Sequence, residues 1–567
     1  MNTISDLETL SIINCTFQIK SQLVGNSKKL KELRIIGNPI LNRAPDLNGL
    51  DNLEYLDVSG NSIDTLMSDI AFNKNLKHMY ANSNNLKNIH MIYLNQIYAI
   101  NLSIINNNTI HSNLSHNRII GEVKSLSNNA ELLILDLSHN FLQGHVSPFY
   151  ANIKLKILDL SFNNLEHIVE QPSDRESLRP FDKNVELEMI NLSNNWLDNQ
   201  IEGYFDKNIK LKYLNIQNNR FVGGIPDINN NKNLIIFNVS NNSLSSSIKE
   251  ISIKSLSHID ISLNSVKGEL PKFTGCINLL TLNASCNGYS GVIPRFNNTE
   301  LYSLDLSGNK FQATVDFDVP KLKYLDLSNN IIGNITSSFK NNPELFTLDI
   351  SLNEIKGNLP DIASNNNLEY FNASNNRFSS NITSYKISPS VKVADLSVNY
   401  LTGIIQDLDN NIELTELNVS SNLLRGELPE FNANVNLEFL NLSSNHITGN
   451  IPDFSNNYKL AKLDLSYNWI SGVIPSFVNN RFMTTLLLMG NRNLKYYCKN
   501  NGGLLPGVFG IGGDICDLGS VTIVSKRDCS DSIKSQCNVN IMSSAKSIYY
   551  IGTIQILAVF SCLLFMF

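Results

Sequence analysis

Apolar residues recur along this chain at one fixed spacing, and the segment Leu437–Phe454, LEFLNLSSNHITGNIPDF, shows that spacing in full. Leucines occupy its first, fourth and sixth positions, an asparagine occupies the ninth, and an apolar IPxF segment closes it. The alternation of Leu440 and Leu442 predicts a short strand that buries one face. Asn445 stands where the chain leaves this strand. Because an amide carries both donors and an acceptor, we expect its side chain to bond the backbone of the next coil.

The same pattern returns every 23 residues from Asn353 to Asn491. Such a fixed period is the signature of a solenoid, in which a single repeat cannot bury its own apolar face and stability comes from stacking. The sequence therefore predicts one elongated body over residues 1–493, with about 22 coils and a parallel sheet along one side.

Three places interrupt the period. The chain opens inside a repeat, with Cys15 in the asparagine position, so either an amino-terminal part with its cap is missing or the protein is cytosolic. Asn107 and Asn117 lie only ten residues apart, and we count a coil at each, with either a repeat that has lost a part or a local irregularity between them. A later coil is lengthened by the charged segment 171–180, QPSDRESLRP, which should loop out of the stack.

The repeat resembles the plant-specific subclass of leucine-rich repeat, whose mark is a GxIP or GxLP segment after LDLSxNxL. Segments of this kind stand at 224–226 (shortened), 268–271, 291–294, 357–360, 426–429, 449–452 and 472–475. The resemblance implies an α/β-type solenoid, mostly β and irregular, shaped as a horseshoe or superhelix whose concave parallel sheet binds other molecules. Receptor kinases of this family carry a kinase after a membrane span. No kinase motif is present here, so the chain resembles the ectodomain of a kinase-less receptor-like protein.

Four cysteines crowd behind the last repeat, within the segment 494–542: Cys498, Cys516, Cys529 and Cys537. In secreted proteins of this family, such a cluster forms a disulfide-stapled carboxyl cap. The sequence does not choose among the three pairings, but the cluster favours an oxidising compartment.

The last segment, 543–567, predicts a membrane attachment. Ile548–Phe567 is a run of twenty uncharged residues, long enough to cross a bilayer core. Ser543 and Ser544 precede it and are small residues of the kind found at GPI attachment sites. We therefore expect a GPI signal, with a terminal transmembrane helix or a buried helix as alternatives, and a location on the extracellular face of the cell membrane.

Two columns of side chains suggest where a ligand binds. The position four residues before each repeat asparagine is often aspartate, and the consecutive run of Asp305, Asp326 and Asp349 could hold a cation or the cationic groups of a ligand. Aromatic residues of the same coils accompany this run, and exposed tyrosines are typical of interface hot spots: Tyr302, Tyr324, Phe346 and Tyr370. The ordinary explanations are family consensus for the aspartates and packing for the rings.

The sequence predicts no enzyme, cofactor or metal site. Its nine histidines match no zinc spacing, and no nucleophile, phosphate-binding or kinase motif is present. A net charge of −6 without a Lys/Arg run argues against a nucleic-acid partner. Many N-x-[ST] sequons arise from the repeat itself. Asn297, Asn334 and Asn381 stand apart from the strand and are the best candidates for glycosylation.

These observations favour a cell-surface recognition or adhesion protein that binds a protein, peptide or glycan on the concave face. Any signalling would then pass through a partner such as a co-receptor. The alternative is an intracellular leucine-rich repeat scaffold that is anchored in a membrane by its tail.

Overall fold

The computed structural model describes residues 6–15, 27–39, 41–65, 73, 75–87, 111–127, 129–172, 177–246, 248–314, 317–336, 338–475, 477, 479–491 and 493–495. The expected cysteine cap and membrane tail lie outside these residues. Contacts within the chain define two compact units. Unit 1 comprises Met1–Lys267 with Pro271–Thr281, and unit 2 comprises Gly268–Leu270 with Leu282–Phe567.

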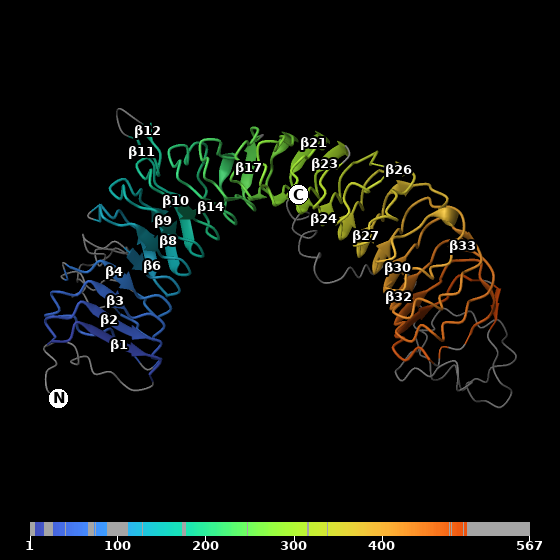
Figure 1. Ribbon diagram of the computed structural model, residues 1–567, viewed down its shortest axis with the longest axis horizontal. Coiled ribbons are helices and arrows are strands. Elements are labelled where there is room, and N and C mark those ends of the chain that lie inside the picture. The colour runs from blue at the N-terminus through green and yellow to red at the C-terminus, as the bar shows by residue number, and fades with distance from the viewer. Residues whose placement is uncertain are drawn as a thin grey trace. The chain divides into compact units, whose positions relative to one another are not determined.

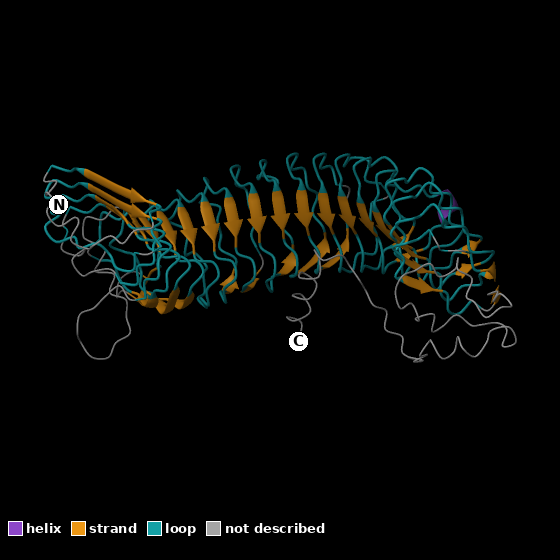
Figure 2. Cartoon of the chain, turned by 90° about the horizontal axis from the view of Figure 1, so that it is seen from below, coloured by secondary structure: helices purple, strands orange, loops and turns teal. Residues whose placement is uncertain are grey.

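Each unit is a parallel β-solenoid, the fold class that the repeat predicts. Each coil contributes one short strand that pairs in parallel with the strand of the next coil (Figure 2). In unit 1 these main strands are β1 (Thr9–Ile13), β2 (Glu32–Ile36), β3 (Tyr55–Asp57), β4 (His78–Tyr80), β5 (His111–Asn113), β7 (Ile134–Asp136), β9 (Ile157–Asp159), β13 (Met189–Asn191), β14 (Tyr213–Asn215), β16 (Ile236–Asn238) and β18 (His258–Asp260). In unit 2 they are β22 (Ser303–Asp305), β24 (Tyr324–Asp326), β25 (Thr347–Asp349), β27 (Tyr370–Asn372), β29 (Val393–Asp395), β30 (Glu416–Asn418), β32 (Phe439–Asn441), β34 (Lys462–Asp464) and β36 (Thr485–Leu487). With β20 (Thr281–Asn283) at the boundary, the described residues contain 21 main strands.

The main strands alternate as predicted. In β24 the side chain of Leu325 is fully buried, whereas Tyr324 and Asp326 lie on the opposite, solvent-facing side. Neighbouring strands keep the same register, so that Leu325 lies beside Leu348 of β25. The leucines therefore form a continuous core column within each unit, and the residues that flank them form a solvent face.

The repeat asparagines form a buried or half-buried column, the first asparagine ladder. Asn445 is typical: its Oδ1 accepts the backbone N–H of Leu424 at 3.0 Å, and its Nδ2 donates to the carbonyl of Val419 at 3.0 Å. Both partners belong to the preceding coil, so the expectation of a bond to the next coil is wrong. The backbone N–H groups of this turn point toward the following coil, as in the bond from Leu442 N to the Asp464 carbonyl, and their acceptor must come from there.

The residue before each ladder asparagine adopts a left-handed backbone. At the non-glycine positions the φ values run from 50° to 57°. Asparagine tolerates this conformation, but some coils place bulky residues there, such as Phe162, Leu352 and Val398. The left-handed conformation costs an L-residue about 1–2 kcal/mol. The geometry of the turn is thus imposed by the stack even where the local sequence opposes it.

A second asparagine ladder runs through the opposite wall of the coils and was not predicted. Asn457 is completely buried, and its Nδ2 donates to the carbonyls of Phe431 and Asn434 at 2.8 and 2.9 Å. A phenylalanine stands three residues before many of these asparagines, and rings of successive coils stack, with 5.7 Å between Phe431 and Phe454. The sequence signal for this ladder is an FxxN motif, of which the IPxF segment contains only the phenylalanine.

A second set of strands, of two to six residues, follows the asparagine turn on the other side of the coils. They are β6 (Ile120–Val123), β8 (Phe141–Val146), β10 (Asn164–Ile168), β15 (Val222–Gly224), β17 (Ser243–Ser246), β19 (Lys267–Glu269), β21 (Gly288–Val292), β23 (Lys310–Ala313), β26 (Lys356–Gly357), β28 (Arg377–Phe378), β31 (Arg425–Gly426), β33 (His446–Ile447), β35 (Ser471–Val473) and β37 (Asn493–Lys495). A 3-10 helix, η4, spans Ile382–Ser384. Gly449 and Gly472 of the GxIP segments have φ values of 80° and 82°, which agrees with the expected bend.

The structure tests two of the predicted interruptions of the period, the one near Asn107 and the one at the segment 171–180. β4 pairs directly with β5, and Leu86 N donates to Oδ1 of Asn117, so no main strand lies between these two strands and the expectation of a separate coil at Asn107 is wrong. Residues 88–110, which include Asn107, lie outside the described residues. The charged segment 171–180 forms an antiparallel hairpin of β11 (Gln171–Pro172) and β12 (Ser177–Leu178), which projects from the coils in Figure 1.

Candidate functional site

Four neighbouring main strands of unit 2 carry the ligand-binding residues that the sequence suggests. The strands are β22, β24, β25 and β27, and the residues are Tyr302, Asp305, Tyr324, Asp326, Phe346, Asp349 and Tyr370, which we call the acidic–aromatic patch. Tyr302 and Phe346 directly precede their strands. The others occupy the outward positions of the strands, where Asp349 is nevertheless buried. The parallel register places Asp305 beside Asp326, and Asp326 beside Asp349. The stacking of coils thus brings together residues that are about one repeat apart.

The aspartates of the patch help to form the turn that follows each strand. Oδ1 of Asp349 accepts hydrogen bonds from the backbone N–H of Ser351 at 2.9 Å and from its hydroxyl at 2.6 Å. Its Oδ2 accepts a hydrogen bond from Nδ2 of Asn372 on the next strand at 3.0 Å. Asp305 holds Ser307 in the same way. This turn explains why Asp or Asn occupies the position in so many coils, which was the ordinary explanation of the column.

Asp326 differs from most of the column because both of its neighbours in the sheet are aspartates. Burial raises the pKa of Asp326 well above its usual value, and the charges of Asp349 and Asp305 raise it further. Burial also raises the pKa of Asp349, against the hydrogen bonds that stabilise its charged form. A carboxylate in this position is relieved by a nearby positive charge. The three carboxylates therefore offer an attractive environment to a cationic group.

The aromatic residues lie beside these carboxylates and are partly exposed. The side chain of Tyr324 is 44% exposed, and its ring meets Phe346 edge-on with 5.9 Å between the centroids. Tyr302, Phe346 and Tyr370 are half-buried. Burial raises the pKa of Tyr370, and its hydroxyl lies 3.4 Å from Nδ2 of Asn372. The patch thus combines rings, a phenolic hydroxyl and carboxylates on a pre-formed surface, which suits non-covalent recognition.

Histidine contacts form a feature that sequence reasoning missed, because it treated the histidines as scattered. The parallel register of β4 and β5 places Nδ1 of His78 3.0 Å from Nδ1 of His111. The rings of His116, His139 and Phe162 stack on three successive coils, with centroid distances of 4.0 and 4.2 Å. Comparison of equivalent positions in successive coils, rather than of spacings within one segment, would have found both contacts.

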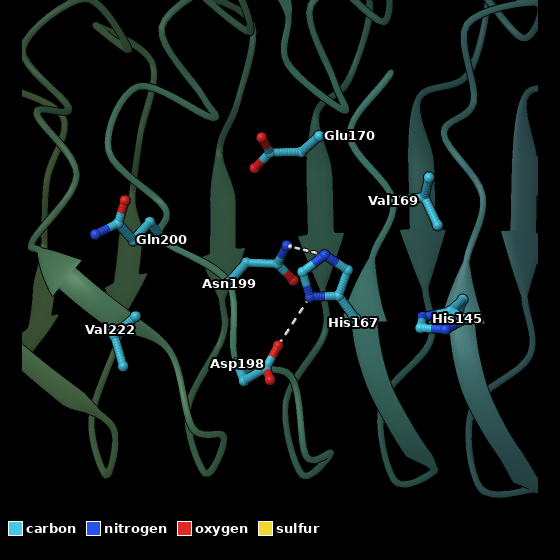
Figure 3. A pocket seen from close by; sticks show the side chains of 8 residues that line it. All are labelled: His145, His167, Val169, Glu170, Asp198, Asn199, Gln200 and Val222. Atoms are coloured by element: carbon cyan, nitrogen blue, oxygen red, sulfur yellow. Dashed lines mark hydrogen bonds and ion pairs between the residues drawn. The ribbon is translucent and has the colours of Figure 1, made fainter. Parts of the chain in front are cut away.

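A shallow groove of about 490 Å³ lies in unit 1 near the hairpin (Figure 3). It is lined by His145, His167, Val169, Glu170, Asp198, Asn199, Gln200 and Val222. The amide of Asn199 is fixed by two bonds to the backbone of Ile168, so its Nδ2 donates to Nε2 of His167 at 3.2 Å. His167 therefore carries its proton on Nδ1 and donates it to Asp198 at 2.9 Å. The groove is a structured polar surface that the sequence did not indicate.

Of the other candidate residues, some are exposed at the surface and the rest lie outside the described part of the chain. Asn297, Asn334 and Asn381 are exposed, as a glycosylation acceptor must be, although the side chain of Asn381 also caps η4 by accepting from Thr383 N. The four candidate disulfide cysteines and the candidate attachment residues Ser543 and Ser544 lie outside the described residues. Over the described ranges, no helix has the length and apolar character to cross a bilayer, and no group of three or more His, Cys, Asp or Glu side chains could hold a metal ion.

Comparisons with known proteins support the repeat assignment. The family model described as Leucine Rich Repeat matches residues 52–73, 210–231, 321–342, 436–457 and 459–481. The comparison with curated protein sequences gives no match.

Several solved structures have the same fold. The plant peptide hormone receptor RGFR1, solved in complex with RGF2, is 26% identical with a TM-score of 0.69, over 86% of this chain and 79% of the receptor chain. The Arabidopsis receptor kinase HAESA, solved with the peptide hormone IDA and the co-receptor SERK1, is 26% identical with a TM-score of 0.68, over 88% of this chain and 87% of the receptor chain. YopM from Yersinia enterocolitica is 20% identical with a TM-score of 0.58, over 87% of this chain and 91% of its own, and shows the fold alone. The chain therefore contains leucine-rich repeats and is structurally similar to the leucine-rich repeat ectodomains of plant receptors.

Proposed function

We propose that this protein is a recognition protein of the cell surface that binds a peptide on the solvent face of its main strands, with signalling through a partner protein. The acidic–aromatic patch of unit 2 is the contact surface in this proposal. The observation that carries it is the similarity, over most of both chains, to two receptors that were solved with peptide hormones bound, one of them with a co-receptor.

The chemistry of the patch supports a peptide with a basic side chain. Tyr324 supplies an exposed ring, and the neighbouring Asp326 is a carboxylate whose ionisation is opposed by burial and by two other aspartates. A guanidinium or ammonium group would relieve that repulsion and could also lie on the ring face. Aromatic side chains within a rigid surface are the usual anchors of an interface.

The first test uses a displayed library of random peptides that is selected on the full chain. Tyr324→Ala and Asp326→Ala should each weaken the binding of the selected peptides by about tenfold, or about 1.4 kcal/mol, relative to the wild-type protein. Tyr400→Ala is the matched control, because Tyr400 is 55% exposed but follows the asparagine turn instead of lying on a main strand. If both patch variants bind as tightly as the wild-type protein, the patch is not the contact surface.

The second test concerns the compartment. A cell-surface protein that carries a GPI anchor should be released from intact cells by a phosphatidylinositol-specific phospholipase. Glycosidase treatment should also change its electrophoretic mobility if Asn297, Asn334 or Asn381 carries a glycan. Protein that resists both treatments and is protected from protease added to intact cells would support the intracellular, tail-anchored scaffold instead.

A further inference from the structure

His78 and His111 lie side by side on the solvent face of unit 1. They occupy the same position of adjacent main strands, β4 and β5, and their Nδ1 atoms are 3.0 Å apart. Both rings are half-buried. Imidazole nitrogen is a common ligand of transition metal ions. We propose that these two histidines form a binding site for a divalent transition metal ion.

The distance between the two nitrogen atoms fits this proposal. A zinc ion binds histidine nitrogen at about 2.0–2.1 Å. Two such bonds that meet at between 90° and 110° hold the nitrogens about 2.9–3.4 Å apart, and the observed separation falls within this range. Without a metal, the contact must instead be a hydrogen bond between rings of opposite tautomers. A metal-binding measurement therefore distinguishes a metal site from a hydrogen-bonded pair of histidines.

The other histidine contacts of the described residues do not have this geometry. His116 and His139 stack face to face with 11° between their planes, and ring nitrogens coordinate in the plane of the ring, so the two cannot converge on one ion. His167 already uses both nitrogens, on Asp198 and Asn199. His258, on the same face of β18, points its Nδ1 at the hydroxyl of Thr281 at 2.9 Å.

The surroundings supply one oxygen atom as a candidate third ligand. The hydroxyl of Tyr80 lies 3.5 Å from Nδ1 of His111, and Asp57 occupies the neighbouring position of β3. The charge of Lys77 is shared with Glu54 through an ion pair of 2.8 Å. Because only two strong ligands are fixed, the remaining positions are open to water or to a group of a bound ligand. Imidazole with oxygen ligands suits Cu²⁺, Ni²⁺ and Zn²⁺, and does not suit Mg²⁺ or Ca²⁺.

Titration of the tag-free full chain with Cu²⁺, Ni²⁺ and Zn²⁺ by calorimetry tests the proposal. One ion should bind, most tightly Cu²⁺ as the ordinary order of divalent affinities requires, without competition from Mg²⁺. His78→Ala and His111→Ala should each weaken binding by at least about tenfold. His258→Ala is the matched control and should leave binding unchanged, because this histidine stands alone at the equivalent strand position.

A second measurement keeps the test independent of folding effects in the variants. Electron paramagnetic resonance of the Cu²⁺-loaded wild-type protein should show coupling to two imidazole nitrogens, and each single variant should retain coupling to at most one at this site. The proposal is overturned if the wild-type chain binds none of the three ions, or if the double variant His78→Ala/His111→Ala binds Cu²⁺ as tightly and with the same spectrum.

Discussion

Removal of one asparagine from the first ladder tests how the coils hold together. Asn376 is only 7% exposed. Its Oδ1 accepts the backbone N–H of Ile355 at 3.0 Å, and its Nδ2 donates to the carbonyl of Ile350 at 2.8 Å. Two longer bonds, of 3.3 and 3.2 Å, join Nδ2 to the carbonyls of Ala373 and Ser374. In Asn376→Ala the N–H of Ile355 and the carbonyl of Ile350 both lose their side-chain partner inside the stack.

The expected loss follows from these two groups. An unsatisfied buried polar group costs about 1–3 kcal/mol. The shorter bonds to Ile355 and Ile350 dominate, so Asn376→Ala should lower the free energy of unfolding of unit 2 by about 2–5 kcal/mol. Asn367→Ala is the matched control, since Asn367 is exposed and makes a single bond of 3.2 Å to the Pro343 carbonyl of the adjacent coil. A surface change of this kind should cost less than about 0.5 kcal/mol.

Urea unfolding and hydrogen exchange together provide the assay. Urea reports the stability of the unit, and exchange by mass spectrometry reports the amide of Ile355, which should lose its protection in Asn376→Ala even in the absence of urea. Equal stability of Asn376→Ala and Asn367→Ala, with the Ile355 amide still protected, would refute the view that the ladder asparagines satisfy otherwise unpaired backbone groups.

Three further predictions follow from the turns and the aspartate column. Val398→Gly should raise the free energy of unfolding by about 1 kcal/mol, and the thermal midpoint with it, because Val398 holds a φ of 54° that glycine adopts without strain. An unchanged midpoint would contradict the strain argument. Gly449→Ala should be more destabilising than Gly357→Ala in urea, because the added Cβ would lie 2.6 Å from Cγ of Glu427, whereas nothing lies within 4 Å at Gly357; equal losses would leave only the shared positive φ as the cause. Asp326→Asn should stabilise unit 2 at pH 7 by up to about 1 kcal/mol. The raised pKa of Asp326 means that the folded state holds its proton more tightly than the unfolded state, so this residue lowers stability as the pH rises above the unfolded value. Unfolding curves of the two proteins should therefore coincide in acid and separate toward neutral pH, and a constant difference would argue against ionisation as the cause.

The sequence predicted the fold because the fold is periodic. The positions of Leu440, Leu442 and Asn445 repeat so regularly that strand, burial and ladder follow from one coil, and the parallel β-solenoid agrees with that expectation. The prediction of a coil at Asn107 was wrong because a match to the repeat motif does not show whether the segment forms a main strand. Only pairing between β4 and β5 decides it. The second ladder was missed because asparagine in a polar stretch looks like a loop residue until the neighbouring coil supplies its acceptors.

The candidate site was predictable in its composition but not in its contacts. The chain positions of Tyr324 and Asp326 follow from the period, and so does their solvent-facing side. The hydrogen bond that Asp349 accepts from Asn372 of the next strand, and the exposed fraction of each ring, depend on packing between coils that no single repeat contains. The pair of His78 and His111 was hidden for the same reason, since 33 residues separate two side chains that the register brings into contact.

The direction of the first ladder has a consequence for the order in which the protein is made. Each coil receives an acceptor from the coil that follows it, as Ile470 N does from Oδ1 of Asn491 at 3.0 Å. On the ribosome, the newest coil is therefore left with an open N–H until the ribosome has added about one more repeat. Release of a nascent chain between repeats would expose that group, whereas a pause just after an asparagine turn would leave every earlier coil complete.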